Sequence, residues 1–321
     1  MTIRSLTAPP SDPEVDAWLA VLASAGAADW PQQPAPTRVE VAGRLRVPPA
    51  RGRAALWAAD GGEGVAGLLL FTDEANTHTA YLDVLAVRPD ARRRGVGTAL
   101  WERVRAELLA QGRTSVSTVL DLEGPGQTFA QSLGFENVLP LSWYVRDLPA
   151  EPRGAGPTTV AAGYELLTWH GLVPGEWADA AAVAHGAMED APSGDMDEQI
   201  QSWTAQRLHA AQQLILDRDG EMTTVAAVTA AGEVAAYTEL ALPDPAGPRA
   251  LQYDTVVVPA HRGHGLGRAV KQRMEAEAAV RYPALRQIAT TVADENTPMR
   301  TVNEALGYRW ERDAAVFQLT L

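Results

Sequence analysis

A glycine-rich turn in the last third of the chain reads His261-Arg262-Gly263-His264-Gly265-Leu266-Gly267-Arg268. It follows the β-branched run Thr255–Val258 and Pro259, and apolar residues then recur at the spacing of an amphipathic helix, at Leu266, Val270, Met274 and Ala278. The pattern predicts a strand, a turn and a helix. Because the first N–H groups of a helix lack intrahelical partners, and glycine lets an anion approach them, the turn is a predicted phosphate or pyrophosphate site.

The same element occurs earlier in the chain. The apolar run Val84–Val87 leads through Pro89 into Arg92-Arg93-Arg94-Gly95-Val96-Gly97-Thr98, and its helix has apolar residues at Val96, Leu100, Val104 and Leu108. The landmarks of the two copies differ by one constant offset (262 − 92 = 170). Two copies in one register, each with the same strand and helix, indicate an internal repeat.

Both turns satisfy Arg/Gln-x-x-Gly-x-Gly/Ala, and at these residues the chain resembles the GNAT N-acetyltransferases. The two-copy layout is similar to that of mycothiol synthase and related actinobacterial tandem enzymes. The resemblance implies that the turns hold the pyrophosphate of acetyl-CoA or another acyl-CoA, and that the preceding strand holds its pantetheine arm. It implies cofactor contacts at Val256, Val258, Arg262, Gly263, His264, Gly265, Leu266, Gly267, Arg268 and Asn296, and in the first copy at Val87, Arg92, Arg94, Gly95, Val96, Gly97 and Thr98.

Each copy is predicted to have the α+β fold, with a mixed, mostly antiparallel sheet flanked by helices, because antiparallel hairpins precede a strand–helix–strand crossover. We expect domains at residues 1–150 and 163–321, joined by a Pro- and Gly-rich linker at 151–162. Among the expected elements are a helix from Asp12 to about Ser24, followed by a proline-containing loop. Others are a helix over 197–216 and a strand over 308–321 that closes the second sheet.

Composition limits the function. The 321 residues have a net charge of −13 and no cysteine, which excludes disulfides and thiolate chemistry. No apolar run is long enough to span a bilayer, and the N-terminus lacks the apolar core of a signal peptide, so we expect a cytoplasmic protein without membrane partners. The single lysine, Lys271, among 27 basic residues suggests a GC-rich bacterial genome.

The negative charge lies mostly in the second half of the chain. Residues 1–153 have 18 acidic and 15 basic side chains, whereas residues 154–321 have 22 and 12. This balance argues against nucleic-acid binding. An acidic second half favours a cationic acceptor such as an amine, and solubility is the alternative explanation.

Acyl transfer to an amine requires a group that accepts a proton from the incoming ammonium. Asp254 is the only carboxylate in the apolar strand before the second turn, and Glu239 is a second candidate in the preceding strand. The alternative for Asp254 is a strand residue that faces solvent. Asp83, its nearest counterpart in the first copy, is one residue out of register with it. Because side chains alternate along a strand, at most one of the two aspartates is expected to be functional.

The resemblance also implies roles for two asparagines near the C-terminus. Many members of the family have Asn-x-x-Ala followed by a tyrosine that acts as general acid. Asn296 matches the first asparagine, and Asn303 occupies the tyrosine position. An amide can bond to a thioester or pantetheine but cannot act as an acid, so we expect water to supply the proton. The aligned first-copy residues, Glu123 and Ala130, lack both functions, so we expect the second copy to catalyse.

Other polar segments leave alternatives open. The acidic segment 188–198 would line the acceptor side in the family, or else form a solvated loop whose Asp197 caps the next helix. His170 is interpreted as a strand-end residue, and His264 as a cationic aid to the phosphate turn. No spacing of His, Asp and Glu residues indicates a metal site.

The leading hypothesis is an N-acyltransferase that moves an acyl group from acetyl-CoA to the primary amine of a small, cationic acceptor by direct attack, without a covalent enzyme intermediate. The alternatives are a non-catalytic acyl-CoA-binding scaffold and an acyltransferase whose donor is the thioester of an acyl-carrier protein. Neither turn continues into the Lys-Ser/Thr of a P-loop, and Leu100 and Val270 replace the third glycine of a dinucleotide fingerprint. Monomer and homodimer both remain open.

Overall fold

The computed structural model describes residues 2–148, 158–190 and 194–321. The chain forms two compact units. Unit 1 comprises Met1–Leu141, Ser193–Gln199 and Asp313–Leu321, and unit 2 comprises Ser142–Pro192 and Ile200–Arg312. The units thus depart from the predicted domains, because each takes segments from both halves of the sequence. Within the predicted linker, residues 151–157 lie outside the described part of the chain.

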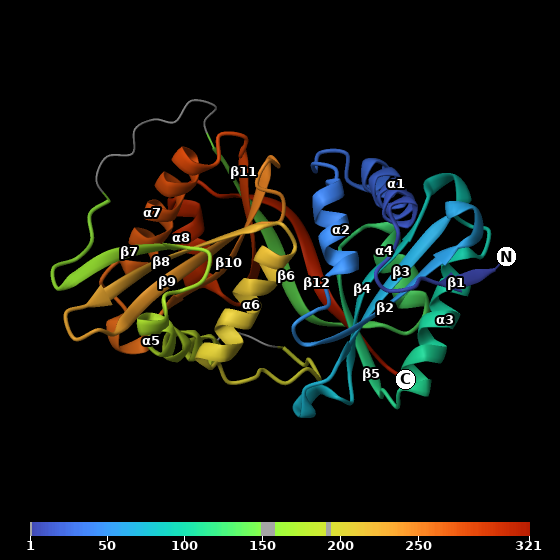
Figure 1. The fold of residues 1–321 in the computed structure, drawn as a ribbon, viewed down its shortest axis with the longest axis horizontal. Helices are drawn as coiled ribbons and strands as arrows, with labels where there is room; N and C mark the ends of the chain where they lie inside the picture. The colour runs from blue at the N-terminus through green and yellow to red at the C-terminus, as the bar shows by residue number, and fades with distance from the viewer. Residues whose placement is uncertain (1, 149–157, 191–193) are drawn as a thin grey trace. The chain divides into compact units, whose positions relative to one another are not determined.

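Unit 1 has helices on both faces of a mixed sheet (Figure 1). Its strands pair in the order β1-β2-β3-β4-β5, antiparallel as far as β4 and parallel between β4 and β5. One core packs α3 against the sheet, and a second packs α1 and α2 against the other face. The bounds are β1 Ile3–Ser5, α1 Asp12–Asp29, α2 Arg38–Arg46, β2 Gly52–Ala59, β3 Gly64–Phe71, β4 Ala80–Val87, α3 Val96–Ala110, β5 Ser115–Asp121 and α4 Pro125–Ser132.

The first two helices differ from their prediction. Helix α1 is capped by Ser11 in a reciprocal pair with Glu14, and it continues to Asp29 rather than ending near Ser24. Helix α2 was missed, since the prolines before it suggested a loop. Its start signal is present in the sequence: Thr37 and Glu40 form a capping box that satisfies backbone N–H groups at the first turn.

The C-terminal strand completes the sheet of unit 1. In β12 (Arg309–Thr320), residues Ala314–Thr320 pair antiparallel with β5, and Phe317 is 1% exposed in the core that contains α3. The expectation that the whole segment 308–321 closes the second sheet is therefore wrong. Of β12, only Arg309–Arg312 belong to unit 2. Strand β6 (Glu136–Asp147) is likewise divided, and it begins in unit 1 and ends in unit 2.

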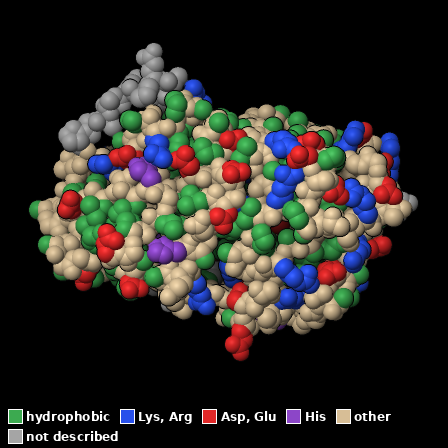
Figure 2. All heavy atoms as spheres, viewed as in Figure 1, with side chains coloured by type: hydrophobic (Ala, Val, Ile, Leu, Met, Phe, Trp, Pro, Cys, Tyr) green, Lys and Arg blue, Asp and Glu red, His purple; other side chains and the backbone are tan. Residues whose placement is uncertain are grey.

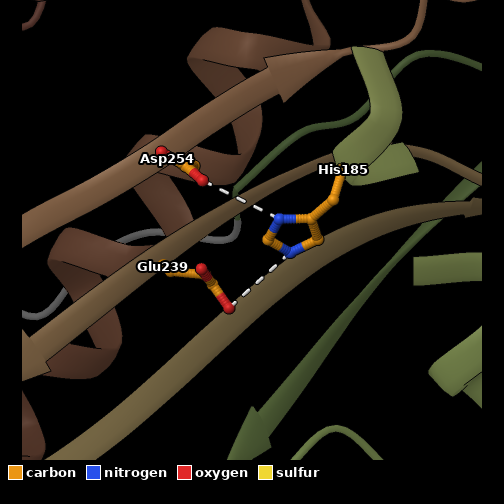
Figure 3. Close-up of side chains that lie close together, drawn as sticks. All are labelled: His185, Glu239 and Asp254. Carbon is orange, nitrogen blue, oxygen red and sulfur yellow. Dashed lines mark ion pairs between the residues drawn. The ribbon is translucent and has the colours of Figure 1, made fainter. Parts of the chain in front are cut away.

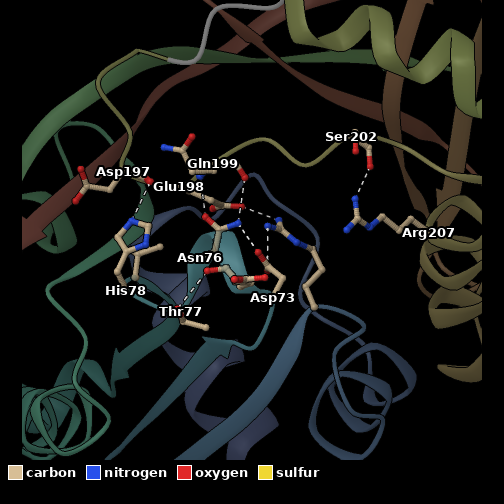
Figure 4. A network of polar contacts seen from close by, with 12 residues as sticks. Asp73, Asn76, Thr77, His78, Asp197, Glu198, Gln199, Ser202 and Arg207 are labelled. Carbon is tan, nitrogen blue, oxygen red and sulfur yellow. Dashed lines mark hydrogen bonds and ion pairs between the residues drawn. The ribbon is translucent and has the colours of Figure 1, made fainter.

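A short segment from the second half of the sequence also binds to unit 1 (Figure 4). The side chain of Asn76 bonds to both the backbone N–H and the C=O of Gln199, at 2.7 and 3.1 Å. Arg51 pairs with Glu198 at 2.6 Å. Helix α6 begins at Ala205 with Thr204 as its cap, so the predicted helix start and cap at Asp197 are wrong. Of the acidic segment, Glu198 is thus paired with a basic side chain of unit 1.

Unit 2 repeats the architecture with strand order β11-β10-β9-β8-β7. One core packs α7 against the sheet, and α5 and α6 pack on residues that belong to a separate core. Helix α8 ends just before Gly307, whose φ of 80° is typical of the glycine that follows a helix C-terminus. The bounds are β7 Tyr164–His170, α5 Gly175–His185, α6 Ala205–Asp217, β8 Glu221–Thr229, β9 Val234–Leu242, β10 Arg249–Val257, α7 Leu266–Arg281, β11 Gln287–Ala293 and α8 Thr297–Ala305.

Acidic and basic side chains are intermixed on the face drawn in Figure 2. Among the described residues, no helix has the length and apolar character needed to cross a membrane.

Candidate active site

The two glycine turns have the same backbone conformation. Gly95 and Gly265 are left-handed N-caps with φ of 83° and 71°, and the residues two positions earlier, Arg93 and Gly263, also have positive φ. The first bond of α7 runs from the N–H of Ala269 to the C=O of Gly265, so the preceding N–H groups of the helix have no helical partner. Neither helix has a side-chain cap or an acid in its first turn. Both termini therefore suit an anion.

Arg92 and Arg262, the first residues of the two motifs, form hydrogen bonds that stabilise the turns. Arg92 donates from Nε to the C=O of Val87 at 3.1 Å, and Arg262 donates in the same way to Val257 at 3.3 Å. The other guanidinium nitrogens of Arg92 bind Asp29 at 2.6 and 2.8 Å, so in unit 1 this side chain is held by a carboxylate. Around the turns, Arg94, Thr98, His264 and Arg268 are exposed, whereas Val96 and Leu266 are buried.

The strand that leads into the second turn separates from its parallel neighbour. Strand β10 pairs with β11 only from Arg249 to Leu251, and a bulge interrupts its pairing with β9 between Gln252 and Thr255. The N–H of Val258 donates to Ala235 at 2.9 Å. By alternation, the backbone groups of Val256 and Val258 face β9, whereas those of Thr255 and Val257 face the open edge. The residues predicted to hold pantetheine thus lie one position away from the edge-facing ones.

The bulge places Asp254 beside two other titratable side chains (Figure 3). His185 is the last residue of α5, and its ring lies between the two carboxylates. Nδ1 is 3.7 Å from Asp254 Oδ2, and Nε2 is 3.8 Å from Glu239 Oε1. Glu239 also accepts a hydrogen bond of 2.9 Å from Gln212 Nε2 on α6. The side chains of His185 and Glu239 are buried, and that of Asp254 is one third exposed.

Burial separates the proton affinities of the three groups. It raises the pKa of Glu239 to about 8, with a further contribution from the charge of Asp254. It raises the pKa of Asp254 to about 6 and lowers that of His185 to about 3. Near pH 7 the cluster therefore has a protonated Glu239, a neutral imidazole and one negative charge, which resides on the exposed member, Asp254.

The cluster has residue types that bind metals, and one ligand atom from each lies within 4.8 Å of the others. Its orientation is less suited to a chelate. Asp254 faces Nδ1 whereas Glu239 faces Nε2, and one ion bonds only one nitrogen of a ring. The arrangement instead resembles a chain of proton donors and acceptors through an imidazole. Sequence spacing did not indicate this grouping, because the three residues come from three separate elements.

Comparison with known proteins identifies the fold. The profile of the Acetyltransferase (GNAT) family matches residues 16–135 and 188–308. The chain belongs to the GNAT acetyltransferase family. It is similar to a tandem GNAT protein from the clavulanic acid biosynthesis pathway, solved without AcCoA, with 28% identity, a TM-score of 0.81 and coverage of 99% of this chain and 98% of that one.

A GCN5-related N-acetyltransferase from Sphaerobacter thermophilus shares the fold, with 16% identity, a TM-score of 0.70 and coverage of 99% and 95% of the two chains. No curated protein sequence matches the chain. This tandem GNAT protein is thus an acetyltransferase by family, and a two-copy arrangement of the fold recurs in the most similar structure described above.

The two predicted asparagines have different surroundings. Asn296 caps α8, because its Oδ1 accepts a bond of 3.2 Å from the N–H of Met299. Asn303 is fully buried, and neither polar atom of its side-chain amide has a partner among the described residues. Such an amide is costly to bury, and it stands where the family resemblance implies a contact with the thioester.

The first GNAT copy lacks the cluster. Asp83 lies at the corresponding bulge of β4, but its side chain pairs with Arg44 from α2. Val84 occupies the position of Asp254, in agreement with the one-residue difference in register. Glu123 has a left-handed backbone and Ala130 is buried. Unit 1 thus keeps the turn for an anion and has no free carboxylate at its bulge.

Two residues at or beside the cluster were not predicted from the sequence. His185 and Gln212 lie on helices, 54 and 27 positions from Glu239, and no motif relates them to the strands. The available signal was weak: each is a polar residue on a largely apolar helix face. His170, in contrast, contacts Thr223 at the edge of the sheet, at 3.2 Å, consistent with its interpretation as a strand-end residue.

Proposed function

We propose that this GNAT protein transfers an acyl group from acetyl-CoA or a related acyl-CoA to the primary amine of a small, cationic acceptor, and that unit 2 catalyses the reaction. One observation carries the proposal. A carboxylate, Asp254, lies at the bulge of a strand that separates from its neighbour and leads directly into an uncapped helix N-terminus.

In this proposal the pyrophosphate binds the N–H groups at the start of α7, where the helix dipole is positive. The edge-facing N–H and C=O groups of Thr255 and Val257 hold the pantetheine arm. This places the thioester close to the bulge, where Asp254 can reach an incoming amine. The single negative charge of the cluster favours a monocationic acceptor.

The reaction proceeds by direct attack. Asp254 takes one proton from the ammonium, and the freed lone pair of the amine forms a bond to the thioester carbonyl carbon. The C–S bond then breaks, the thiolate leaves with its electron pair, and it takes a second proton from the attacking nitrogen through water. One N–H remains in the amide product, and the proton on Asp254 passes to solvent. The enzyme forms no covalent bond.

Release of free CoA from acetyl-CoA in the presence of a panel of small amines tests the proposal. Asp254→Asn should lower kcat/KM by about 100-fold or more, the usual contribution of a general base. Asp83→Asn is the matched control, because Asp83 lies at the equivalent bulge of unit 1 and is already paired with Arg44. It should leave turnover unchanged.

Three outcomes contradict parts of the proposal. Loss of turnover in Asp83→Asn rather than in Asp254→Asn would assign catalysis to unit 1. Turnover with an acyl-carrier thioester but not with acetyl-CoA would show that the donor is a carrier protein. Tight acetyl-CoA binding without turnover on any amine would favour a non-catalytic acyl-CoA-binding scaffold.

A further inference from the structure

We propose that His185 and Glu239 are positioning residues that sit behind Asp254 and keep its carboxylate charged and oriented. The inference rests on the proposed function for its kinetic consequences. The geometry that supports it is independent of that function: one imidazole ring lies between two carboxyl groups, with a different ring nitrogen facing each (Figure 3).

The ring is fixed by aromatic neighbours. His185 stacks on Tyr237 with centroids 4.1 Å apart and an interplanar angle of 27°, and the ring of Trp203 lies 4.6 Å away. Its side chain is 2% exposed. A ring confined in this way can rotate little, so its two nitrogens keep facing Asp254 and Glu239.

The ring has an unused donor or acceptor. Nδ1 of His185 is buried and has no hydrogen-bond partner among the described residues, although Asp254 Oδ2 is 3.7 Å away. An unbonded buried nitrogen is costly, and a small movement of the partly exposed aspartate would satisfy it. Binding of the acceptor ammonium to Asp254 orders that side chain and provides the occasion for such a movement.

The protonation states select one tautomer. A neutral Glu239 has an O–H that can donate to Nε2 of His185, which leaves the ring proton on Nδ1. That N–H then donates to the carboxylate of Asp254 and stabilises its negative charge. Gln212 donates to Glu239 from the other side at 2.9 Å, and so holds the acid in place.

Among the side chains that the structure describes, the titratable groups that face the ring all belong to this arrangement. These are Asp254 on β10 and Glu239 on β9, together with the buried phenol of Tyr237, also on β9. Burial raises the pKa of that phenol well above its usual value, so it stays neutral. A change of charge near pH 6 therefore belongs to Asp254, and one near pH 8 belongs to Glu239.

Imidazole ¹⁵N chemical shifts of His185 test the arrangement without any need for turnover. We expect the neutral Nδ1–H tautomer from pH 5 to 7.5, with an inflection near pH 6 that disappears in Asp254→Asn. An Nε2–H tautomer, or a His185 that itself becomes an imidazolium near pH 6, would overturn the inference. Either result would leave the proposed acyl transfer intact.

The pH dependence of kcat/KM gives the second test, with an acceptor whose ammonium group does not titrate below pH 9. His185→Phe keeps an aromatic ring but removes the donor, so the ascending limb should move up by about one pH unit, a tenfold change in proton affinity. His185→Asn keeps an N–H donor attached to Cγ, where His185 has Nδ1. In this variant the ascending limb of kcat/KM should therefore lie near pH 6, as in the wild-type protein. Glu239→Gln should abolish only the change in kcat/KM near pH 8 and leave the ascending limb in place.

His170→Asn serves as the control for histidine replacement, because His170 contacts Thr223 at the sheet edge instead of the cluster. A purely structural role for His185 predicts a uniform fall in rate with unchanged midpoints in His185→Phe. That pattern would overturn the inference. A complete absence of turnover in the wild-type protein, with the expected ¹⁵N shifts, would instead reject the proposed function alone.

Discussion

A single position of register separates the two aspartates that could act as bases. Asp83 and Asp254 both lie at a bulge of the strand before a glycine turn, yet one pairs with Arg44 and the other faces His185. The sequence predicted that the two acids differ, because side chains alternate along a strand. It did not predict the bulge, which adds one residue to the strand and re-aims its side chains. It also did not predict that Asp254 would face His185 on α5.

Lys271, the only lysine, is a buried amine that makes stability depend on pH. Its side chain lies over the ring of Tyr308, 4.7 Å from the centroid, and burial lowers its pKa to about 7. An unfolded chain keeps that proton up to about pH 10.4, so between pH 7 and 9 the unfolded state binds more protons and stability rises with pH. In Lys271→Met this rise should be smaller. Thermal unfolding at pH 7 and 9 measures it, and an equal rise in both proteins would contradict the assignment.

The buried amide of Asn303 gives a second prediction at this scale. Replacement by leucine keeps the branching and the number of heavy atoms and removes two unbonded polar atoms, so Asn303→Leu should raise the free energy of unfolding of the unliganded protein by about 1–3 kcal/mol. If the amide contacts the thioester, the same change should weaken acetyl-CoA binding. Urea unfolding and calorimetric titration measure the two effects. Destabilisation without ligand would show that the amide has a partner within the protein.

At the scale of elements, local signals predicted the glycine turns and the hairpins. They failed where a signal was present but outweighed, as at α2, whose capping box follows a proline-rich segment. They also failed at the start of α6, where acidic residues suggested a helix N-terminus eight positions too early. In the structure Glu198 of this acidic segment pairs with Arg51, and the next residue, Gln199, bonds to Asn76. Long-range contacts thus replace the local preference.

The glycine turns permit a matched comparison between the two copies. A Cβ at Gly267 would lie 3.3 Å from Val257 Cγ2, and one at Gly97 would lie 3.5 Å from Phe129. Valine at either position therefore narrows the approach of a pyrophosphate to the helix N-terminus. Gly267→Val should remove the catalytic acetyl-CoA site and turnover, whereas Gly97→Val should leave turnover unchanged.

Calorimetric stoichiometry distinguishes the roles of the two turns. If unit 1 also binds cofactor, the wild-type protein takes two equivalents of acetyl-CoA and each variant takes one. If unit 2 alone binds, Gly97→Val retains the single site. Loss of turnover in Gly97→Val with an intact second site would contradict the assignment of catalysis to unit 2.

For the whole molecule, the repeat of the glycine turns predicted two copies of the fold, but their boundaries in sequence do not coincide with the compact units. The choice of a strand's partner is a long-range property, because pairing depends on which edge is open and not on the strand's own residues. The alternation of β12 is equally compatible with either sheet. Only the structure reveals that Ala314–Thr320 pair with β5.

The pairing of Ala314–Thr320 with β5 predicts that the C-terminus of the chain stabilises the N-terminal sheet. Phe317 lies in the same buried core of unit 1 as Trp57, Leu68 and Leu100, so Phe317→Ala should lower the free energy of unfolding by about 3–5 kcal/mol through the cavity it leaves. Hydrogen exchange followed by mass spectrometry should show faster exchange in β3, β4 and α3. Leu240→Ala in the core of unit 2 is the matched control, with faster exchange in β8, β9 and α7. Loss of protection in β8 and β9 on replacement of Phe317, with β3 unaffected, would mean that β12 belongs to the second sheet after all.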